Sequence, residues 1–107
     1  MIFTKSKQEV LSLTTDYAVV RKITDTLSLN KHAYKIINTG DAAITYKIEG
    51  WFVSGSSYPT VIQTAGLAAA AEAQVNITDL YGETSISAKA DSGTSEATIE
   101  WATQRIG

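Results

Sequence analysis

The chain has 107 residues, 44% of them hydrophobic, and a formal net charge of −2, which suits one globular domain and excludes wholesale disorder. Its nine Lys and Arg residues are scattered, so there is no basic patch to suggest nucleic acid as a partner. Cysteine is absent, which excludes disulfides, thiolate metal sites and cysteine nucleophiles.

The N-terminal sequence MIFTKSKQEV lacks the apolar run of a signal peptide, and nowhere do about 18 apolar residues follow one another as a membrane span requires. We therefore expect a protein made in the cytoplasm, with no membrane partner, that either stays there or leaves inside a particle. Residues 1–8 are mostly polar and predict an N-terminal arm or short edge segment. Residues 9–107 predict a single domain.

The first strands are short. Residues 9–13 and 17–20 are brief apolar runs, and a strand is predicted near 26–29. The clearest pattern follows, with strands predicted at 31–37 and 42–49 around a turn at 38–41. In the second of these, Ile44, Tyr46 and Ile48 alternate with polar residues, which indicates one dry and one wet face. The two strands are predicted to form a hairpin.

Gly50 ends this alternation and predicts a bulge or bend. Residues 54–57 form a loop, and Pro59 opens a strand at 60–64. The alanine-rich segment 66–73 is compatible with a two-turn helix, but its strand-like flanks favour a loop or single helical turn before a strand at 74–78. A second hairpin is predicted from strands 84–90 and 95–104. Seven or eight such strands predict an all-β fold, a single antiparallel β-sandwich that is Ig-like or jelly-roll-like.

No pattern in the chain predicts catalysis or a cofactor. His32 is the only histidine, whereas a zinc site needs three or four ligands, so a structural or surface role is expected for it. No phosphate-binding loop, nucleophile elbow or calcium loop is present. The acidic residues show no spacing that would place two of them in one cleft. We therefore expect no enzyme, no cofactor and no bound metal.

The aromatic residues offer the best candidates for contact. Trp101 and Phe52 are predicted to lie in the core, because large aromatic side chains dominate small cores. Trp51 shares the parity of the wet face, so it should be exposed unless a bulge resets the register. Together with Ser56 and Tyr58 in the adjoining loop, it predicts either a protein interface or a carbohydrate-binding face.

Three stretches carry a resemblance in turn placement and strand rhythm: IINTGDAAITYKIEG (36–50), LAAAAEAQVNITDLYG (67–82) and ISAKADSGTSEATIEWATQR (86–105). They resemble small β-sandwich virion proteins of tailed bacteriophages, many of which are capsid decoration (cement) proteins or other head and tail accessory subunits. The resemblance implies a non-enzymatic structural protein located in the virion. Its partners would be the major capsid protein or another virion protein, with many copies or a homo-oligomer on the particle.

An arm at residues 1–8, including Ile2 and Phe3, would then add a strand to the sheet edge of a neighbour. The predicted interface residues are therefore Ile2, Phe3, Trp51, Ser56 and Tyr58. The alternative function is a carbohydrate- or ligand-binding module that uses Trp51 and Tyr58.

Overall fold

The structure, a computed structural model, describes every residue except 25, 27–28, 30 and 107. The described chain forms eight β-strands: β1 (Ile2–Leu13), β2 (Ala18–Ile23), β3 (Lys31–Asn38), β4 (Ile44–Trp51), β5 (Thr60–Leu67), β6 (Glu72–Ile77), β7 (Glu83–Ala90) and β8 (Ser95–Ile106). They build the all-β antiparallel sandwich that the sequence predicts.

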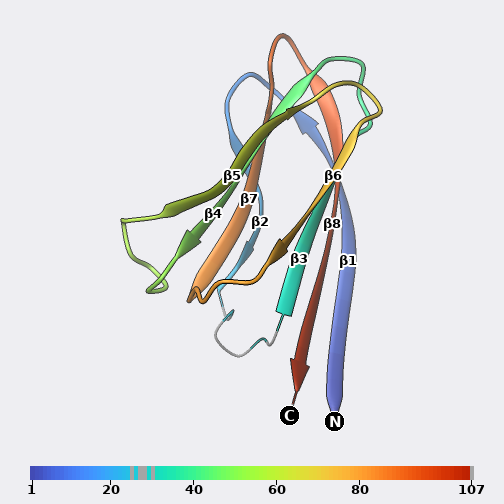
Figure 1. Cartoon of the computed structure of the whole chain (residues 1–107). Coiled ribbons are helices and arrows are strands. Elements are labelled where there is room, and N and C mark those ends of the chain that lie inside the picture. Colours follow the sequence, from blue (N-terminus) through green and yellow to red (C-terminus); the bar gives the residue numbers. More distant parts are fainter. Residues whose placement is uncertain (25, 27–28, 30, 107) are drawn as a thin grey trace.

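Two four-stranded sheets face each other (Figure 1), with the strand orders β1-β8-β3-β6 and β2-β7-β4-β5. Along the described chain, consecutive strands belong to opposite sheets except β4 and β5, which are neighbours in one sheet. This interleaving is that of a jelly roll. Of the two predicted architectures, the structure therefore has the jelly-roll one.

Both predicted hairpins are wrong. β3 pairs with β6 and β8, whereas β4 pairs with β5 and β7, so the turn after β3 crosses between the sheets. The β7–β8 turn crosses in the same way. Hydrogen bonds tie the first turn to other strands, because Asn38 Nδ2 donates to the carbonyl of Leu67 (3.1 Å) and Gly40 N–H donates to that of Glu96 (3.0 Å). Alternation predicts a half-buried strand but does not identify its partner.

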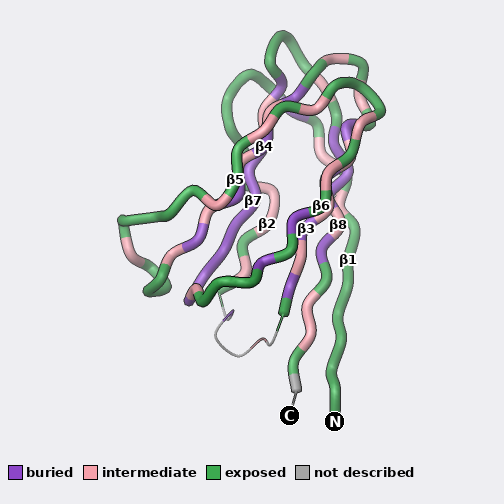
Figure 2. Tube along the Cα trace, in the orientation of Figure 1, coloured by how far each residue is buried: buried purple, intermediate pink, exposed green. Residues whose placement is uncertain are grey.

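The core lies between the sheets and comes from the inward positions of the strands (Figure 2). Trp101, 4% exposed, is in the core as predicted, and it is the cross-strand partner of fully buried Tyr34. The prediction for Phe52 is wrong, because this side chain is 70% exposed in the loop that follows β4. Trp51 keeps the parity of the wet face, since the pairing of β4 with β7 is unbroken through Trp51. Its side chain is half-buried.

Gly50 does not end β4. The register shift lies between Ile48 and Glu49, on the side that pairs with β5. Glycine is required at position 50 because the ring of Tyr81 packs on it, and an added Cβ would lie 2.5 Å from Tyr81 Cδ1. The bulge between Ile48 and Glu49 therefore affects the pairing with β5 at the sheet edge and does not reverse the faces of β4.

The alanine-rich segment is a turn between strands, as favoured by the sequence. β5 extends to Leu67, residues 68–71 form the turn, and β6 begins at Glu72, two residues earlier than predicted. Ala70 has a φ of 67° in this turn. The predicted strand near 26–29 includes residues 27–28, which are outside the described residues. Thr26 and Leu29 belong to no strand, and Leu29 N–H donates to the Thr26 carbonyl (3.1 Å).

Candidate interaction site

The first candidate surface is the edge formed by β1. This strand pairs with β8 through twelve consecutive residue pairs without a register shift, and its other side is the edge of the sheet. The segment 2–8, predicted as an arm or edge segment, is therefore the first half of β1. Figure 1 shows β1 and β8 running together to the termini, past the ends of the other strands. The division of the chain into an arm and a domain stays a prediction.

The other three sheet edges are shorter or interrupted. β2 shifts register between Val19 and Arg21, the β4–β5 pairing shifts between Ile48 and Glu49, and β6 has six residues. Short strands and bulges are devices that prevent unwanted pairing at sheet edges. β1 has neither over its twelve residues. Among the described strands, it is thus the edge best suited to accept a strand from another chain.

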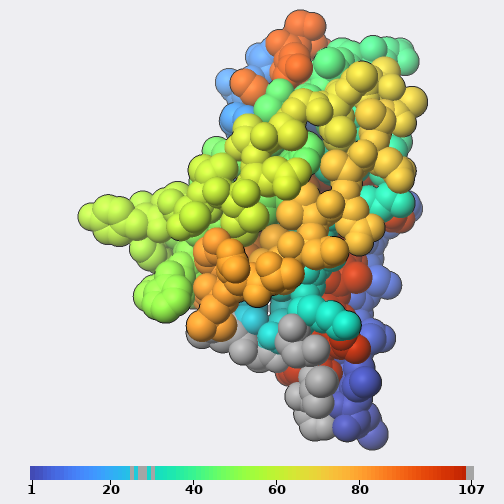
Figure 3. All heavy atoms as spheres, viewed as in Figure 1, coloured from blue at the N-terminus to red at the C-terminus, as the bar shows by residue number. Residues whose placement is uncertain are grey.

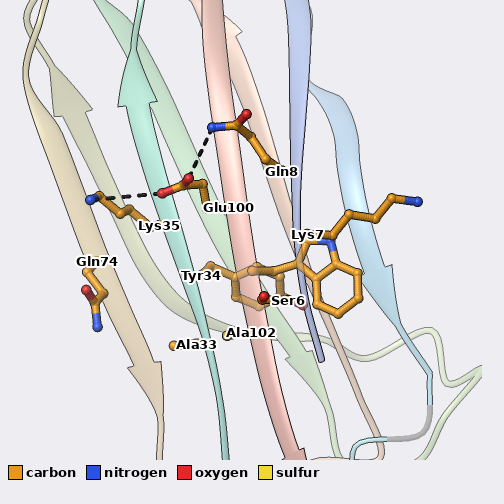
Figure 4. Close-up of a pocket in the computed structure, with 10 residues that line it drawn as sticks. Ser6, Lys7, Gln8, Ala33, Tyr34, Lys35, Gln74, Glu100 and Ala102 are labelled. Carbon is orange, nitrogen blue, oxygen red and sulfur yellow. Dashed lines mark hydrogen bonds and ion pairs between the residues drawn. The ribbon is translucent and has the colours of Figure 1, made fainter. Parts of the chain in front are cut away.

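The outward face beside this edge is a groove (Figure 4). Its floor is a cross-strand row of small side chains, in which Ser6 pairs with Ala102 and Ala102 pairs with Ala33. The adjoining row has longer side chains, and Gln8, Glu100 and Lys35 come from three neighbouring strands. The groove has a volume of about 490 Å³ here, and a second hollow of about 770 Å³ continues it past Ala33 and Ala102 towards the free end of β1.

The long side chains beside this floor form hydrogen bonds and ion pairs with one another. Gln8 Nε2 donates to Glu100 Oε2 (3.1 Å), and Lys35 Nζ lies 4.0 Å from Glu100 Oε1 and 3.6 Å from Glu72 Oε1. The row offers both donors and acceptors without an excess of one charge. It can therefore hydrogen-bond to a polar surface, but its geometry does not assemble a nucleophile with a base.

Towards the N-terminal end of β1, Lys and Arg side chains lie over aromatic rings. Arg21 Cζ lies 4.3 Å and Lys5 Nζ 5.8 Å from the centroid of the Trp101 ring, and Arg105 Cζ lies 5.5 Å from that of Phe3. Such cation–π contacts stabilise by about 0.5–1 kcal/mol each at exposed sites. Lys5 of one sheet and Arg21 of the other thus reach the same Trp101 ring.

The second candidate surface is the loop between β4 and β5, which projects from the molecule at the left of Figure 3. It carries exposed apolar side chains, with Phe52 70%, Val53 63% and Tyr58 85% exposed. Within the loop, Ser56 is half-buried, and its Oγ accepts a hydrogen bond from Tyr58 N–H (3.1 Å). Three large exposed apolar residues on one projecting loop make it a candidate contact surface.

A buried carboxylate anchors this loop to the body of the sandwich. Glu83, 3% exposed at the start of β7, accepts hydrogen bonds from Ser54 Oγ (2.9 Å) and Gly55 N–H (3.2 Å) on one oxygen. Lys22 Nζ lies 2.9 Å from its other oxygen. Burial alone would raise the pKa of the Glu83 carboxyl, but the hydrogen bonds from Lys22, Ser54 and Gly55 outweigh it and lower the pKa below its ordinary value.

His32 takes part in a buried hydrogen-bonded cluster that joins the two sheets. Its Nε2 lies 3.0 Å from Thr84 Oγ1, and the Tyr34 hydroxyl lies 2.8 Å from the same oxygen. Burial lowers the pKa of His32 and raises that of Tyr34 to about 12. Among the described residues, no three His, Asp or Glu side chains are grouped as a metal site would require. The surroundings of His32 are those of a structural residue.

The predicted interface residues fall into two separate groups. Ile2 and Phe3, 59% and 46% exposed, lie at the N-terminal end of β1. The other three, Trp51, Ser56 and Tyr58, lie in or beside the projecting loop. Figure 1 shows the N-terminal end of β1 and the loop between β4 and β5 well apart, on opposite sides of the view. Their role in binding stays a prediction. The groove residues were missed, because small side chains such as Ala33 and Ala102 become a floor only once strand pairing aligns them.

No family model and no curated protein matches the chain. Among solved structures, it is similar to PirA, with a TM-score of 0.73 at 10% identity over 88% of this chain and 92% of PirA. A subunit of the disulfide-linked pili known as Bacillus endospore appendages gives a TM-score of 0.67 at 14% identity, over 97% of this chain and 87% of that one.

The SPBc2 prophage-derived protein YomS is similar over 94% of this chain and 95% of its own, with a TM-score of 0.56 at 10% identity. At these identities, each likeness shows the fold alone. In the described part of the chain, a helix of the length and apolarity needed to cross a membrane is not found.

Proposed function

We propose that this chain is a non-enzymatic structural subunit that works in many copies, specifically a capsid decoration or cement protein of a tailed phage. The observation that carries the proposal is the long, regular β1 edge, which offers unpaired main-chain groups for pairing between subunits. The projecting loop supplies a second, apolar contact well apart from the N-terminal end of β1 (Figure 1). A subunit with two separate contact surfaces can bind a particle and a neighbour at once.

The fold comparisons support a structural role without identifying the particle. Proteins of this fold include a pilus subunit and a prophage-derived protein. The pilus named there is disulfide-linked, whereas this chain has no cysteine. Its assembly therefore cannot use disulfides, and modest contacts would be strengthened by repetition over a particle surface.

The test locates the chain in particles made by cells that carry its gene. Phage particles are purified by density gradient, and peptide mass spectrometry measures the amount of the chain relative to the major capsid protein. The proposal expects a fixed ratio that survives repeated purification, and a chain found only in the unsedimented fraction would overturn it. Joint substitution Phe52→Ser and Tyr58→Ser should reduce the ratio, whereas Val19→Ser, at a site 65% exposed on β2, should not.

The carbohydrate-binding alternative depends on free aromatic faces. Tyr58 is exposed, but Lys22 Nζ lies 5.3 Å from the centroid of the Trp51 ring and occupies one of its faces. Sugar stacking on Trp51 would thus be confined to the other face. Titration of tryptophan fluorescence with glycans tests this alternative, which requires a response that Trp51→Ala abolishes.

A further inference from the structure

The charged residues of β1 lie on one side of the strand. Leu13 is buried and Leu11 half-buried, so the odd-numbered positions of β1 point towards the inner side of the sheet. Lys5, Lys7 and Glu9 share this side, and Ser6 and Gln8 point outwards into the groove. Any strand that pairs with the free edge of β1 must accommodate two lysines and one glutamate at successive inner positions.

We infer that the β1 edge pairs with β1 of a second copy, antiparallel, around a two-fold axis through Gln8. The inference rests on the proposed assembly function and names the partner at this edge. An antiparallel pair between identical strands places one residue opposite itself, and the residues of every other pair then sum to twice its number. With Gln8 at the axis, Lys7 lies opposite Glu9 of the second copy, and Glu9 opposite its Lys7.

The charges select this register over its neighbours. An axis at Lys7 or at Glu9 places that charge opposite its own copy, and an axis at Ser6 places Lys5 opposite Lys7 of the second copy. Like charges directly opposite each other destabilise a strand pair, whereas opposite charges contribute about 0.2–1 kcal/mol each. The Gln8 axis creates two attractive pairs and leaves no like charges directly opposed.

The remaining pairs in this register are compatible with it. Val10, 61% exposed, lies opposite Ser6 of the second copy, and Lys5 lies opposite Leu11, where its aliphatic stem can pack. Residues 3–13 of both copies are paired, without a bulge to interrupt them. The result is one continuous eight-stranded sheet, a size that open sheets commonly reach.

Lysines on an edge strand also serve to block pairing. In that reading Lys5 and Lys7 keep the protein monomeric, and the two readings predict different masses in solution. If the strands pair, the lysines disfavour the other registers by charge repulsion, and Glu9 favours the Gln8 register by attraction to Lys7.

Charge reversal provides the test, with dimerisation measured by sedimentation at low salt. Lys7→Glu alone converts both attractive pairs into repulsive ones and should weaken dimerisation at least tenfold. Glu9→Lys does the same, and it also removes the ion pair of Glu9 Oε1 with Arg21 Nη1 (3.8 Å) within the chain. The double variant, Lys7→Glu with Glu9→Lys, restores opposite charges and should regain most of the affinity. Lys31→Glu, a charge reversal at an exposed site on β3 of the same sheet, is the matched control and should leave dimerisation unchanged. Circular dichroism checks that each variant is folded.

Crosslinking tests the axis independently, because Gln8→Cys places two thiols opposite each other and should form a disulfide dimer under mild oxidation. Ser6→Cys faces Val10 instead and should crosslink much less. A monomer at all concentrations, or a dimer that the double variant does not rescue and Gln8→Cys does not crosslink, overturns the inference. A β1 dimer that never enters particles would support the inference and refute the proposed function. Particle binding that Lys7→Glu does not change, in a protein that forms no dimer, would support the proposed function and refute the inference.

Discussion

The anchor of the projecting loop gives the most quantitative prediction, through the substitution Glu83→Gln. The carboxylate is 3% exposed and accepts two hydrogen bonds from the loop, besides its ion pair with Lys22 at 2.9 Å. The Gln side chain keeps one acceptor oxygen but replaces the other with a donor facing the Lys22 ammonium. The loop itself is unchanged in sequence.

The expected cost is about 2–3 kcal/mol of unfolding free energy. Hydrogen bonds to a charged group contribute about 1.5–3 kcal/mol each, and we discount this because the Lys22 side chain is 51% exposed and solvent screens its charge. For a domain of this size, 1 kcal/mol corresponds to roughly 4–8 °C, so the melting temperature should fall by roughly 10 °C or more at pH 7.

The effect has a defined pH dependence. Since the pKa of Glu83 is lowered in the fold, its contribution is fully present above the ordinary carboxyl pKa and is lost as pH falls through the folded pKa. The wild type and Glu83→Gln should therefore converge in stability in strong acid.

Thermal unfolding followed by circular dichroism at several pH values measures the difference, and limited proteolysis of residues 52–59 reports on the loop. Ser87→Ala, a buried polar site on the same strand, is the control. A change in melting temperature under 2 °C at pH 7, with no faster cleavage, would refute this account of the anchor.

Three further predictions concern the interior. Gly50→Ala should destabilise strongly, because its Cβ would meet the Tyr81 ring at 2.5 Å, and denaturant unfolding should show a loss of more than about 2 kcal/mol; an unchanged midpoint would contradict the close approach. Thr84→Val should cost about 1–3 kcal/mol, because His32 Nε2 and the Tyr34 hydroxyl lose their shared partner, and an equally stable variant would show that neither bond matters. Because the pKa of His32 is lowered in the fold, the unfolded chain takes up this proton first as the pH falls. The free energy of unfolding should therefore decrease below about pH 6.5. Urea unfolding at several pH values should show this decrease for the wild type but not for His32→Gln.

The strands and much of the core could be predicted from alternation, because a half-buried strand must repeat its apolar residues with period two. Ile44, Tyr46 and Ile48 are all buried, as their pattern indicates. The pairing could not be predicted in the same way. A glycine-containing turn suits a hairpin and a crossing between sheets equally, and here the side chain of Asn38 and the carbonyl of Glu96 decide in favour of the crossing.

The contact surfaces were predicted only in part. Residues 2–13 contain neither glycine nor proline, and that signal alone allows one long strand in place of an arm. Phe52 shows the limit of composition, since the aromatic character that favours a core position is equally suited to an exposed contact. The groove depends on the alignment of four strands, which no local pattern encodes.

Hydrogen exchange along β1 measures most directly whether this edge is where the protein meets its neighbours. Every second amide of a strand at the edge of a sheet faces away from its one partner and exchanges freely in an isolated molecule. Peptides covering residues 3–13 should therefore gain protection as the concentration rises or as the chain joins a particle, while those from the β5 and β6 edges stay unchanged. Exchange in β1 that is the same in the assembled and isolated states, or protection that appears at β5 or β6 instead, would contradict the account.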